Sequence, residues 1–549
     1  MKLIFKYIPY AIVGIFAFQQ CADSTTKKNY KGLVVSQEQQ ASWIRNFNPL
    51  TPGGSARWPT AAGIYEPLMI YNSMKGKYIP WLAVKHEWNV RNDILILDIR
   101  KDVSWSDSQP FSGKDVLFTF NLLKEFPAFD IRALWSYLES VKLLNEYEVE
   151  FTFSSIYVPG LDAIVGQTIV PEHIWSKVED PIKFTNPDPV GTGPYTEILK
   201  FQNQVWELGK NPNYWQPGKP KVEKLTFPAF PTNVQATYAL INGEVDWAGN
   251  FIPAIDRIFV DKNPENHHYW FPRSGGSIFL YPNTTKKHLN NKAFRKAISY
   301  SIDRELIAKV AMYDYTVPAD ITALSEGMSR WRENKKRNEN WNKFNRDKAI
   351  SLLDSLKYSF SKDKTSYDNN ELAFEIIVVS GWSDWIRAAQ IISRNLKAIG
   401  INASVRTYDF GTWFSKLQTG DFDLAIAWAE KGNTPYNLYR GLMSQKLVKP
   451  IDETSSLNWH RYGNAEIDVL CQQYEKTSDP KLIKNIIFKM QDIFIENLPA
   501  IPLFSEPSWG EYNTSRFTNF PNEQNPYAQL SPNNVPENLL VLIELEPVK

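Results

Sequence analysis

The sequence predicts an α/β protein that is large enough for two or three domains. Its 549 residues compare with roughly 100–200 for a typical domain. From position 385 onward, apolar residues recur at spacings of 4, 3, 4 and 3, which predicts a helix over 384–399 that ends at Gly400. Alternating apolar residues over 401–405 then predict a strand, and 195–201 with 205–208 predict a hairpin. Helices and strands that alternate along a chain are typical of α/β folds.

The N-terminal residues predict export. Lys2 and Lys6 precede a largely apolar stretch that is too short to span a bilayer as a helix. A basic start followed by a short apolar stretch is typical of a secretory signal. We therefore expect residues 1–20 to be a signal peptide.

Cys21 follows this stretch directly and has the position of a lipoprotein cysteine, which is acylated after cleavage. Such sites have a small residue before the cysteine, whereas this chain has Gln19 and Gln20. The alternative is a plain exported protein with an incidental cysteine. The polar residues 21–31 would form a lipid-anchored tether. Cys471 would then be the remaining thiol of the mature chain, and its helical apolar surroundings predict that it is buried.

Composition and motifs argue against nucleic-acid binding and most catalysis. The chain has 61 basic and 60 acidic residues, so a basic surface for nucleic acid is not expected. Its six histidines show no helical zinc-site spacing, and there is no phosphate-binding glycine loop, Gly-x-Ser-x-Gly elbow or Cys-x-x-Cys. We expect no metal, no cofactor and no enzyme activity. Pairs of acids far apart in sequence leave a glycoside hydrolase as an alternative.

The aromatic content points to the ligand. The chain has 19 Trp, 26 Tyr and 31 Phe. The C–H faces of sugar rings lie flat on indole, which also offers an N–H at its edge. A groove rich in tryptophan and rimmed by amides and carboxylates suits a neutral oligosaccharide. The alternative for each tryptophan is a place in the core.

Trp382 is the first candidate for contact with such a ligand. It lies in a turn before the predicted helix and off the apolar stripe of that helix, so we expect it to project into a cleft with Asp384 beside it. The alternative role for Asp384 is helix N-cap, which Ser383 can fill instead. Trp413 lies on an apolar helical stripe, and we expect it in the core. Further candidates at loops and lobe edges are Asn46, Arg57, Trp58, Trp247 and Asn250.

Five segments in a fixed order carry a family resemblance. They are Val-Gly-Thr-Gly-Pro-Tyr at 190–195, Asn-Pro-Asn-Tyr-Trp at 211–215, Ile-Asn-Gly-Glu-Val-Asp at 241–246, the helix pair at 291–304 and Gly-Asp-Phe-Asp-Leu at 420–424. Together they resemble the family 5 extracellular solute-binding proteins, which capture ligands for bacterial ABC importers. The resemblance runs from about 46 to about 532.

The resemblance implies a two-lobed, periplasmic-binding-protein-like fold (type II, cluster C) with mixed sheets, a hinge and an extra subdomain. Lobe I would comprise 32–75, 195–280 and 505–549. The subdomain of lobe I would span 76–194, and lobe II 281–504. The resemblance also implies that the protein acts in the periplasm or at the cell surface and that ABC permease subunits are its partners.

Shorter segments resemble the branch of the family that binds cello-, xyloglucan- or chito-oligosaccharides. They lie at 43–49, 65–68, 381–385, 507–512 and 525–528. In that branch the tryptophans that match Trp382 and Trp509 sandwich sugar rings. The aspartate that matches Asp384 holds hydroxyl groups. The resemblance therefore implies an oligosaccharide ligand.

One position separates this prediction from a peptide ligand. Peptide-binding members carry Gly-Trp-x-x-Asp, whose aspartate pairs with the peptide ammonium, whereas residues 427–431 are Ala-Trp-Ala-Glu-Lys. Lys431 would repel an ammonium by about a kcal/mol or more. Glu430 is one residue away and would offset this, which leaves a peptide receptor as an alternative. Trp428 is either a stacking platform or part of the lobe core.

The sequence as a whole predicts a monomeric lipoprotein that captures an oligosaccharide by hinge closure and delivers it to a permease. Its contact with the membrane would be through the lipid anchor only. The alternatives are an oligopeptide receptor of the same fold, a secreted glycoside hydrolase and a carbohydrate sensor.

Overall fold

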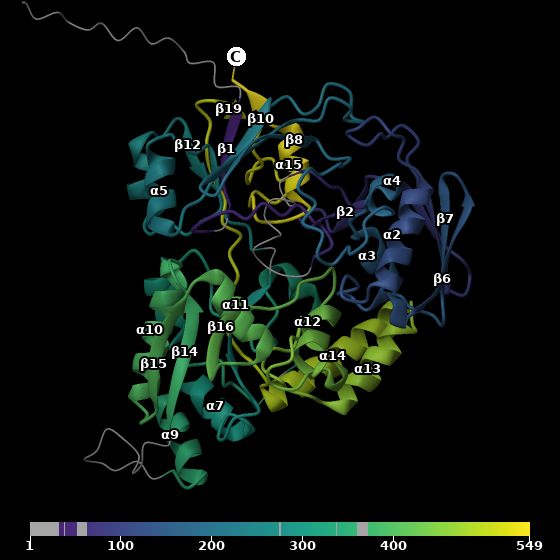
Figure 1. Cartoon of the computed structure of the whole chain (residues 1–549). Coiled ribbons are helices and arrows are strands. Elements are labelled where there is room, and N and C mark those ends of the chain that lie inside the picture. The colour runs from purple at the N-terminus through teal and green to yellow at the C-terminus, as the bar shows by residue number, and fades with distance from the viewer. Residues whose placement is uncertain are drawn as a thin grey trace, which may run out of the picture.

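The computed structural model describes most of the chain, namely residues 32–37, 39–51, 63–273, 276–335, 338–358 and 372–548. The predicted signal peptide, Cys21, the tether, Arg57 and Trp58 lie outside the described residues. Within these ranges no helix is both long and apolar enough to cross a bilayer. Figure 1 shows two lobes, each with its own sheet.

Lobe I is built on a mixed seven-stranded sheet (Figure 1). Its central strand β1 runs parallel to β10 and β11, while β9 and β18 run antiparallel to their neighbours. The helices α5 (Asn233–Ile241) and α15 (Asn538–Glu544) belong to this lobe. In spatial order the strands are β12 (His267–Tyr269), β18 (Glu511–Asn513), β11 (Trp247–Ala248), β1 (Gly32–Ser36), β10 (Lys224–Pro228), β9 (Val205–Lys210) and β8 (Tyr195–Gln202).

Lobe II has a five-stranded sheet in which β14 is parallel to β15 and β16, and β13 is antiparallel to β16 and β17. The strands in spatial order are β15 (Asn402–Tyr408), β14 (Ala373–Val379), β16 (Leu424–Trp428), β13 (Ser277–Pro282) and β17 (Ile501–Ser505). Its main helices are α7 (Lys292–Ser301), α9 (Arg346–Ser355), α10 (Ser383–Lys397), α11 (Phe410–Thr419), α12 (Tyr436–Met443), α13 (Ala465–Glu475) and α14 (Pro480–Asn497).

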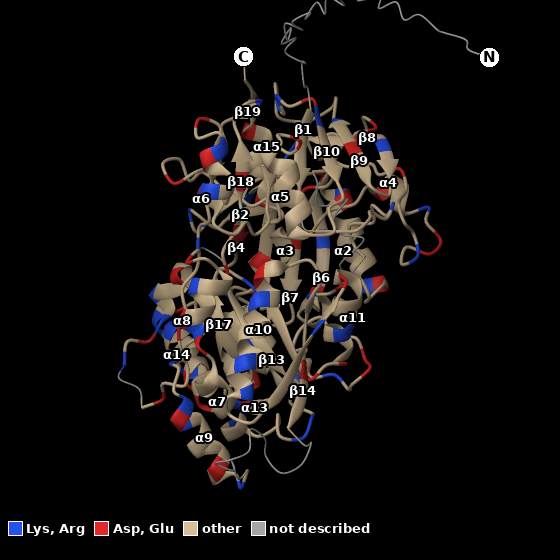
Figure 2. Cartoon of the chain, turned by 90° about the vertical axis from the view of Figure 1, so that its left-hand side faces the viewer, with Lys and Arg blue, Asp and Glu red and all other residues tan. Residues whose placement is uncertain are grey.

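A third sheet lies beside lobe I and above α13 of lobe II (Figure 1). It is antiparallel, with the order β4 (Ala83–Trp88), β5 (Ile94–Ile99), β7 (Glu148–Phe153) and β6 (Leu138–Asn145). It carries α2 (Gly113–Glu125), α3 (Gly160–Val165) and α4 (Glu172–Trp175), and a hairpin of β2 (Met69–Asn72) and β3 (Lys77–Pro80) leads into it. Figure 2 shows acidic and basic residues interspersed over both lobes, as the balanced composition predicts.

The structure confirms most of the predicted local elements. The hairpin is confirmed as β8 and β9. The predicted helix is α10, which begins at Ser383 and ends at Lys397, slightly earlier than expected. The prediction of Ser383 as its N-cap is wrong, because Trp382 occupies that position and makes no side-chain capping bond. Trp413 and Cys471 are buried, as predicted.

The glycines before β8 are required by close backbone contact. A Cβ atom on Gly191 would lie 2.0 Å from the Ile64 carbonyl oxygen, and one on Gly193 would lie 2.0 Å from that of Gly63. The Gly193 N–H donates to the Ile64 carbonyl at 2.9 Å. Only glycine fits such an approach. The motif therefore fixes where β8 enters the sheet of lobe I.

Two connections join the lobes. The chain enters lobe II between β12 and β13, and it returns to lobe I between β17 and β18. The two connections are bonded to each other, since the Trp270 N–H donates to the Gly510 carbonyl at 2.9 Å and the Glu506 N–H donates to the Gly276 carbonyl at 3.0 Å. This pair of connections forms the hinge of the two-lobed fold.

Candidate ligand-binding cleft

A cavity of about 420 Å³ lies where the two lobes and the hinge meet. Lobe I and lobe II each contribute one wall, and the returning hinge segment also lines the cavity. The residues that carry its chemistry are Asn233, Asn250, Phe251, Gln529 and Asn533 of lobe I, Trp382, Asp384, Trp385, Trp428, Glu430 and Lys431 of lobe II, and Glu506 and Trp509 of the hinge.

The wall from lobe II is aromatic. Trp382 packs edge-on against Trp385, with ring centres 4.8 Å apart and planes at 82°. Trp428 follows at the end of β16, with its ring centre 6.2 Å from that of Trp385 and 5.3 Å from that of the buried Trp413. Trp382 and Trp428 are half-buried, so part of each indole remains uncovered. Tight packing behind these rings holds them in place for a ligand to stack on.

Trp509 is the aromatic residue of the hinge. Phe271 and Phe251 meet it edge-to-face, with ring centres 4.9 Å and 5.4 Å away and planes at 86° and 75°. Tyr315 adds a third near-perpendicular ring at 6.1 Å. Such contacts stabilise a fixed ring orientation. Trp509 thus presents a held indole between the two lobes.

The wall from lobe I is polar, and part of its hydrogen-bonding capacity is unused. Asn250 is 1% exposed; its N–H donates to Glu511 at 3.2 Å and its side-chain amide to Thr237 at 3.3 Å. Within the described part of the chain, its Oδ1 has no partner. The same holds there for Oδ1 of Asn533, whose amide donates to Gly249 at 3.0 Å. Buried polar atoms are normally paired, so these acceptors suit a ligand that donates hydrogen bonds.

Asp384 joins the two lobes. It is 3% exposed, and its carboxylate accepts from its own N–H, from that of Trp385 and from the Asn233 side chain of α5. Burial raises its pKa to about 6 against these bonds and the nearby charge of Arg387. The Asn233 N–H also donates to the Gly381 carbonyl at 3.2 Å. The start of α10 is therefore bonded directly to the start of α5.

Arg387 adds a second contact between the lobes, one turn further along α10. Its guanidinium lies 5.0 Å from the ring centre of Phe251 in lobe I. It also lies 5.3 Å from that of Tyr313. A cation over an aromatic face is attracted by the ring quadrupole. The lobes are therefore in direct contact beside the cavity.

Glu430 and Lys431 follow β16 into the cavity. Burial raises the pKa of Glu430 to about 7, although Arg440 and Arg132 lower it. Its Oε2 is buried and finds no donor among the described residues. The Lys431 ammonium lies 2.8 Å from Oε2 of Glu506, so this ion pair spans from lobe II to the hinge.

The structure brings together five of the nine predicted ligand contacts: Trp382, Asp384, Trp428, Trp509 and Asn250. Their contact with ligand stays a prediction. Two others do not line the cavity. Trp247 is buried and its indole N–H donates to the Leu530 carbonyl at 2.7 Å, while Asn46 accepts from the Asn48 N–H at 3.0 Å and shapes a turn. Both have structural roles in this arrangement.

Sequence reasoning missed Glu506, Asn233 and Asn533. Glu506 directly precedes the Pro-Ser-Trp segment at 507–509, so proximity to a known candidate was a usable signal. Asn233 and Asn533 reach the cavity only through the packing of α5 and of the C-terminal loop. Across the described ranges, His, Cys, Asp and Glu form no group of three that would hold a metal ion.

The chain matches the family described as bacterial extracellular solute-binding proteins, family 5 Middle, over residues 77–446. Among solved structures, it is similar to a mannohexaose-bound oligopeptide ABC transporter, periplasmic oligopeptide-binding protein, from Thermotoga maritima. The TM-score is 0.87 at 26% identity, over 95% of this chain and 99% of that one. NikZ from Campylobacter jejuni, in complex with Ni(L-His), has the same fold, with a TM-score of 0.79 at 21% identity over 94% of this chain and 99% of that one.

Two further relatives show similar levels of sequence identity. The nickel-binding periplasmic protein of Escherichia coli K12 is 23% identical over 502 residues, which cover 87% of this chain and 90% of that protein. The glutathione-binding protein GsiB of the same strain is 27% identical over 332 residues, 58% of this chain and 59% of its own length.

Proposed function

Because the chain belongs to the bacterial extracellular solute-binding proteins of family 5, we propose that it captures a neutral oligosaccharide between its lobes and delivers it to an ABC permease. Proteins of this family are periplasmic or extracellular and bind solutes rather than transform them. The proposal therefore concerns the ligand and how it is held.

The observation that carries the proposal is the make-up of the cavity walls. Indole faces of Trp382 and Trp428 stand on one side, and the buried acceptor of Asn250 stands unpaired on the other. A sugar ring has apolar C–H faces and a rim of hydroxyl donors, so it matches both walls at once. The Thermotoga maritima protein, which binds mannohexaose in its crystal structure, supports the same ligand class.

Capture would proceed by hinge closure. A ligand that contacts both walls favours the closed arrangement, since all its contacts form only when the lobes meet. The closed receptor would then dock on its permease. We further propose that the mature protein is a monomer with the domain boundaries predicted above. Cys21 would carry a lipid anchor after removal of residues 1–20.

A peptide is the second candidate, because the same Thermotoga maritima protein is described as an oligopeptide-binding protein. Against it, the Lys431 ammonium occupies the cavity lining near Glu430, where the ammonium of a peptide would need a carboxylate. The two ligand classes differ in charge and therefore can be separated by experiment.

The test is a binding screen followed by recovery of the ligand. Intrinsic tryptophan fluorescence of residues 22–549 would be followed with manno-, cello-, chito- and xylo-oligosaccharides and with a tripeptide mixture. We expect one sugar series to change the emission and to be recovered intact by mass spectrometry. A response to the peptides alone would contradict the sugar ligand, and shortened sugars would indicate a hydrolase.

A further inference from the structure

We propose that the ion pair between Lys431 and Glu506 determines the charge selectivity of the cleft, so that it favours uncharged ligands over those bearing an ammonium or a carboxylate. This inference rests on the proposed function and specifies the ligand class. It concerns Lys431, which lies three residues after β16 in lobe II, and Glu506, which lies in the hinge directly after β17.

The ionisable side chains that line the cavity are mostly acidic. Of the described residues that line the cavity, four have ionisable side chains, namely Asp384, Glu430, Lys431 and Glu506. Lys431 is the one cation among them. Arg387 and Arg440 lie behind the wall, beside Asp384 and Glu430. Removal of the Lys431 charge would therefore leave a lining of carboxyl groups, which attracts ammonium groups.

The pair is held at both ends by backbone contacts. The Glu506 N–H donates to the Gly276 carbonyl at 3.0 Å, and the Lys431 carbonyl accepts from the Asn437 amide at 3.4 Å. The two side chains pass close to Gly276, where a Cβ atom would lie 3.5 Å from the Glu506 carboxylate and 3.6 Å from the Lys431 stem. These contacts position the backbones of both residues, and both side chains line the cavity.

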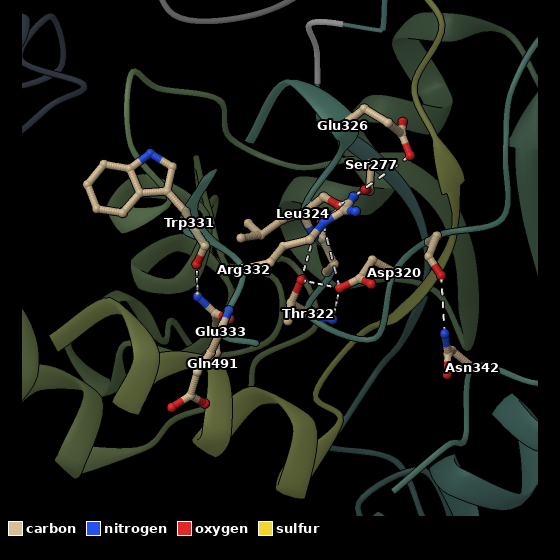
Figure 3. A network of polar contacts seen from close by, with 12 residues as sticks. Ser277, Asp320, Thr322, Leu324, Glu326, Trp331, Arg332, Glu333, Asn342 and Gln491 are labelled. Carbon is tan, nitrogen blue, oxygen red and sulfur yellow. Dashed lines mark hydrogen bonds and ion pairs between the residues drawn. The ribbon is translucent and has the colours of Figure 1, made fainter. Parts of the chain in front are cut away.

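A polar network lies at the first residue of β13, Ser277 (Figure 3). Ser277, at the start of β13, donates to the Ala323 carbonyl at 2.9 Å. Ser505, at the end of β17, donates to Glu326 at 3.0 Å. Arg332 closes the loop by donating to the Leu324 carbonyl at 2.6 Å. Gly276 directly precedes Ser277 and Glu506 directly follows Ser505, so both adjoin residues that these hydrogen bonds hold in place.

Each charge of the pair weakens the attraction that the other charge would exert on a charged ligand. The Lys431 side chain is about half exposed and Glu506 about one quarter exposed, so both charges are within reach of a bound molecule. Without Glu506, the Lys431 ammonium would pair with a ligand carboxylate instead. Without Lys431, the Glu506 carboxylate would join Asp384 and Glu430 in attracting a cation. The intact pair presents neither charge alone.

The experiment compares ligands of one size and three charges. Mannohexaose is the neutral probe, the glucosamine hexamer the cationic one and the mannuronate hexamer the anionic one. Titrations at low salt would use wild type, Lys431→Met, Glu506→Gln and the double variant. Lys286→Met is the matched control, because it breaks a 2.5 Å pair with Asp423 at the opposite end of β16.

We expect wild type to prefer the neutral probe by roughly tenfold or more. Lys431→Met should improve binding of the cationic probe, relative to the neutral one, by roughly tenfold. Glu506→Gln should do the same for the anionic probe. The double variant should regain the neutral preference, and Lys286→Met should keep it. Changes of equal size for all three probes would overturn the proposal, because a structural role predicts no dependence on ligand charge.

Failure of the proposed function would be visible separately. Three forms of trialanine would be titrated in parallel: both ends blocked, only the amine free and only the carboxylate free. If wild type binds the peptides but shows no binding of the sugars, the oligosaccharide assignment fails. The role of the pair would still be supported if Lys431→Met favoured the peptide with a free amine and Glu506→Gln favoured the peptide with a free carboxylate. If neither variant changed the preference for peptide charge, that role would be overturned as well.

Discussion

The two walls of the cleft differ in how they would hold a ligand. Lobe II offers Trp382, Trp385 and Trp428, which are packed on one another and on the core behind them. Lobe I offers Asn250 and Asn533, whose acceptor atoms are unpaired within the described residues. Stacking depends on area and is weakly directional, whereas a hydrogen bond specifies where a donor must be.

The difference indicates that the two lobes contribute to binding in different ways. The aromatic wall would supply most of the affinity, and the polar wall would select the orientation of the hydroxyl groups. With the lobes apart, a ligand would contact one wall only, so full binding requires closure. The contacts around Asp384 and Gly381 decide how the walls are brought together.

The aromatic wall gives the largest expected effect. Trp382→Ala should weaken oligosaccharide binding by about 2–3 kcal/mol, or roughly 100-fold, because an aromatic stacking partner is lost. The measurement is calorimetric titration with the sugar that binds wild type best. Trp88→Ala is the matched control, since Trp88 is also half-buried but packs on Phe153 in the sheet beside lobe I. Equal losses in both variants would mean that general destabilisation, not stacking, explains the result.

The junction of the walls comes next. Gly381 has φ of +86°, and a Cβ atom there would lie 2.5 Å from the Pro231 carbonyl oxygen of lobe I. Gly381→Ala should therefore oppose closure and weaken binding by about 2 kcal/mol, or roughly 30-fold. Small-angle X-ray scattering should then show less compaction with ligand. Gly420→Ala provides the control, because it places the same strain (φ +77°) at the end of α11, against Ile451 of the same lobe. Unchanged compaction in Gly381→Ala would show that the close approach of Gly381 to Pro231 does not control closure.

The polar wall should show a smaller effect. Asn250→Ala removes the unpaired acceptor, and binding should weaken by about 1 kcal/mol, or roughly fivefold. Thr237→Val removes the partner of the Asn250 amide but leaves the acceptor in place, so it should change affinity less. Titration of both variants with the same sugar tests this order. The reverse order would show that the amide, not the acceptor, faces the ligand.

The smallest effect concerns pH. Burial raises the pKa of Glu430 to about 7, so the folded state binds this proton more tightly than the unfolded state does. Its contribution to stability is therefore fully present below the ordinary carboxyl pKa and is lost as pH rises through about 7. Thermal unfolding of wild type and Glu430→Gln at about pH 5 and pH 8 measures this. The loss between the two pH values should be smaller in Glu430→Gln, which has no carboxyl group at this position. An equal loss in both proteins would assign the pH dependence to other groups, such as Asp384.

The sequence predicted those parts of the site that depend on local pattern. Trp382 could be found because it falls off the apolar stripe of α10, and Trp509 because it belongs to a short recognisable segment. Gly191 and Gly193 marked the entry to β8 in the same way. Helix ends were less predictable, since α10 begins with Trp382 in the cap position and no side-chain cap.

The remaining parts depend on contacts between distant segments. Asn233 meets Asp384 across 151 positions of the chain, and Lys431 meets Glu506 across 75. No local pattern encodes such a meeting. Trp247 was predicted from the sequence to contact ligand, but it is buried and its indole N–H donates to a backbone carbonyl. Exposure is set by packing that only the folded chain reveals.

The most direct test of the whole account is calorimetric titration of residues 22–549 with neutral oligosaccharides and tripeptides, repeated with Trp382→Ala and Asn250→Ala singly and together. The account predicts that one sugar series binds and that each wall contributes. It also predicts that the losses are not additive, because both contacts depend on the same closure. Binding of peptides alone, or of sugar with neither variant affected, would contradict it.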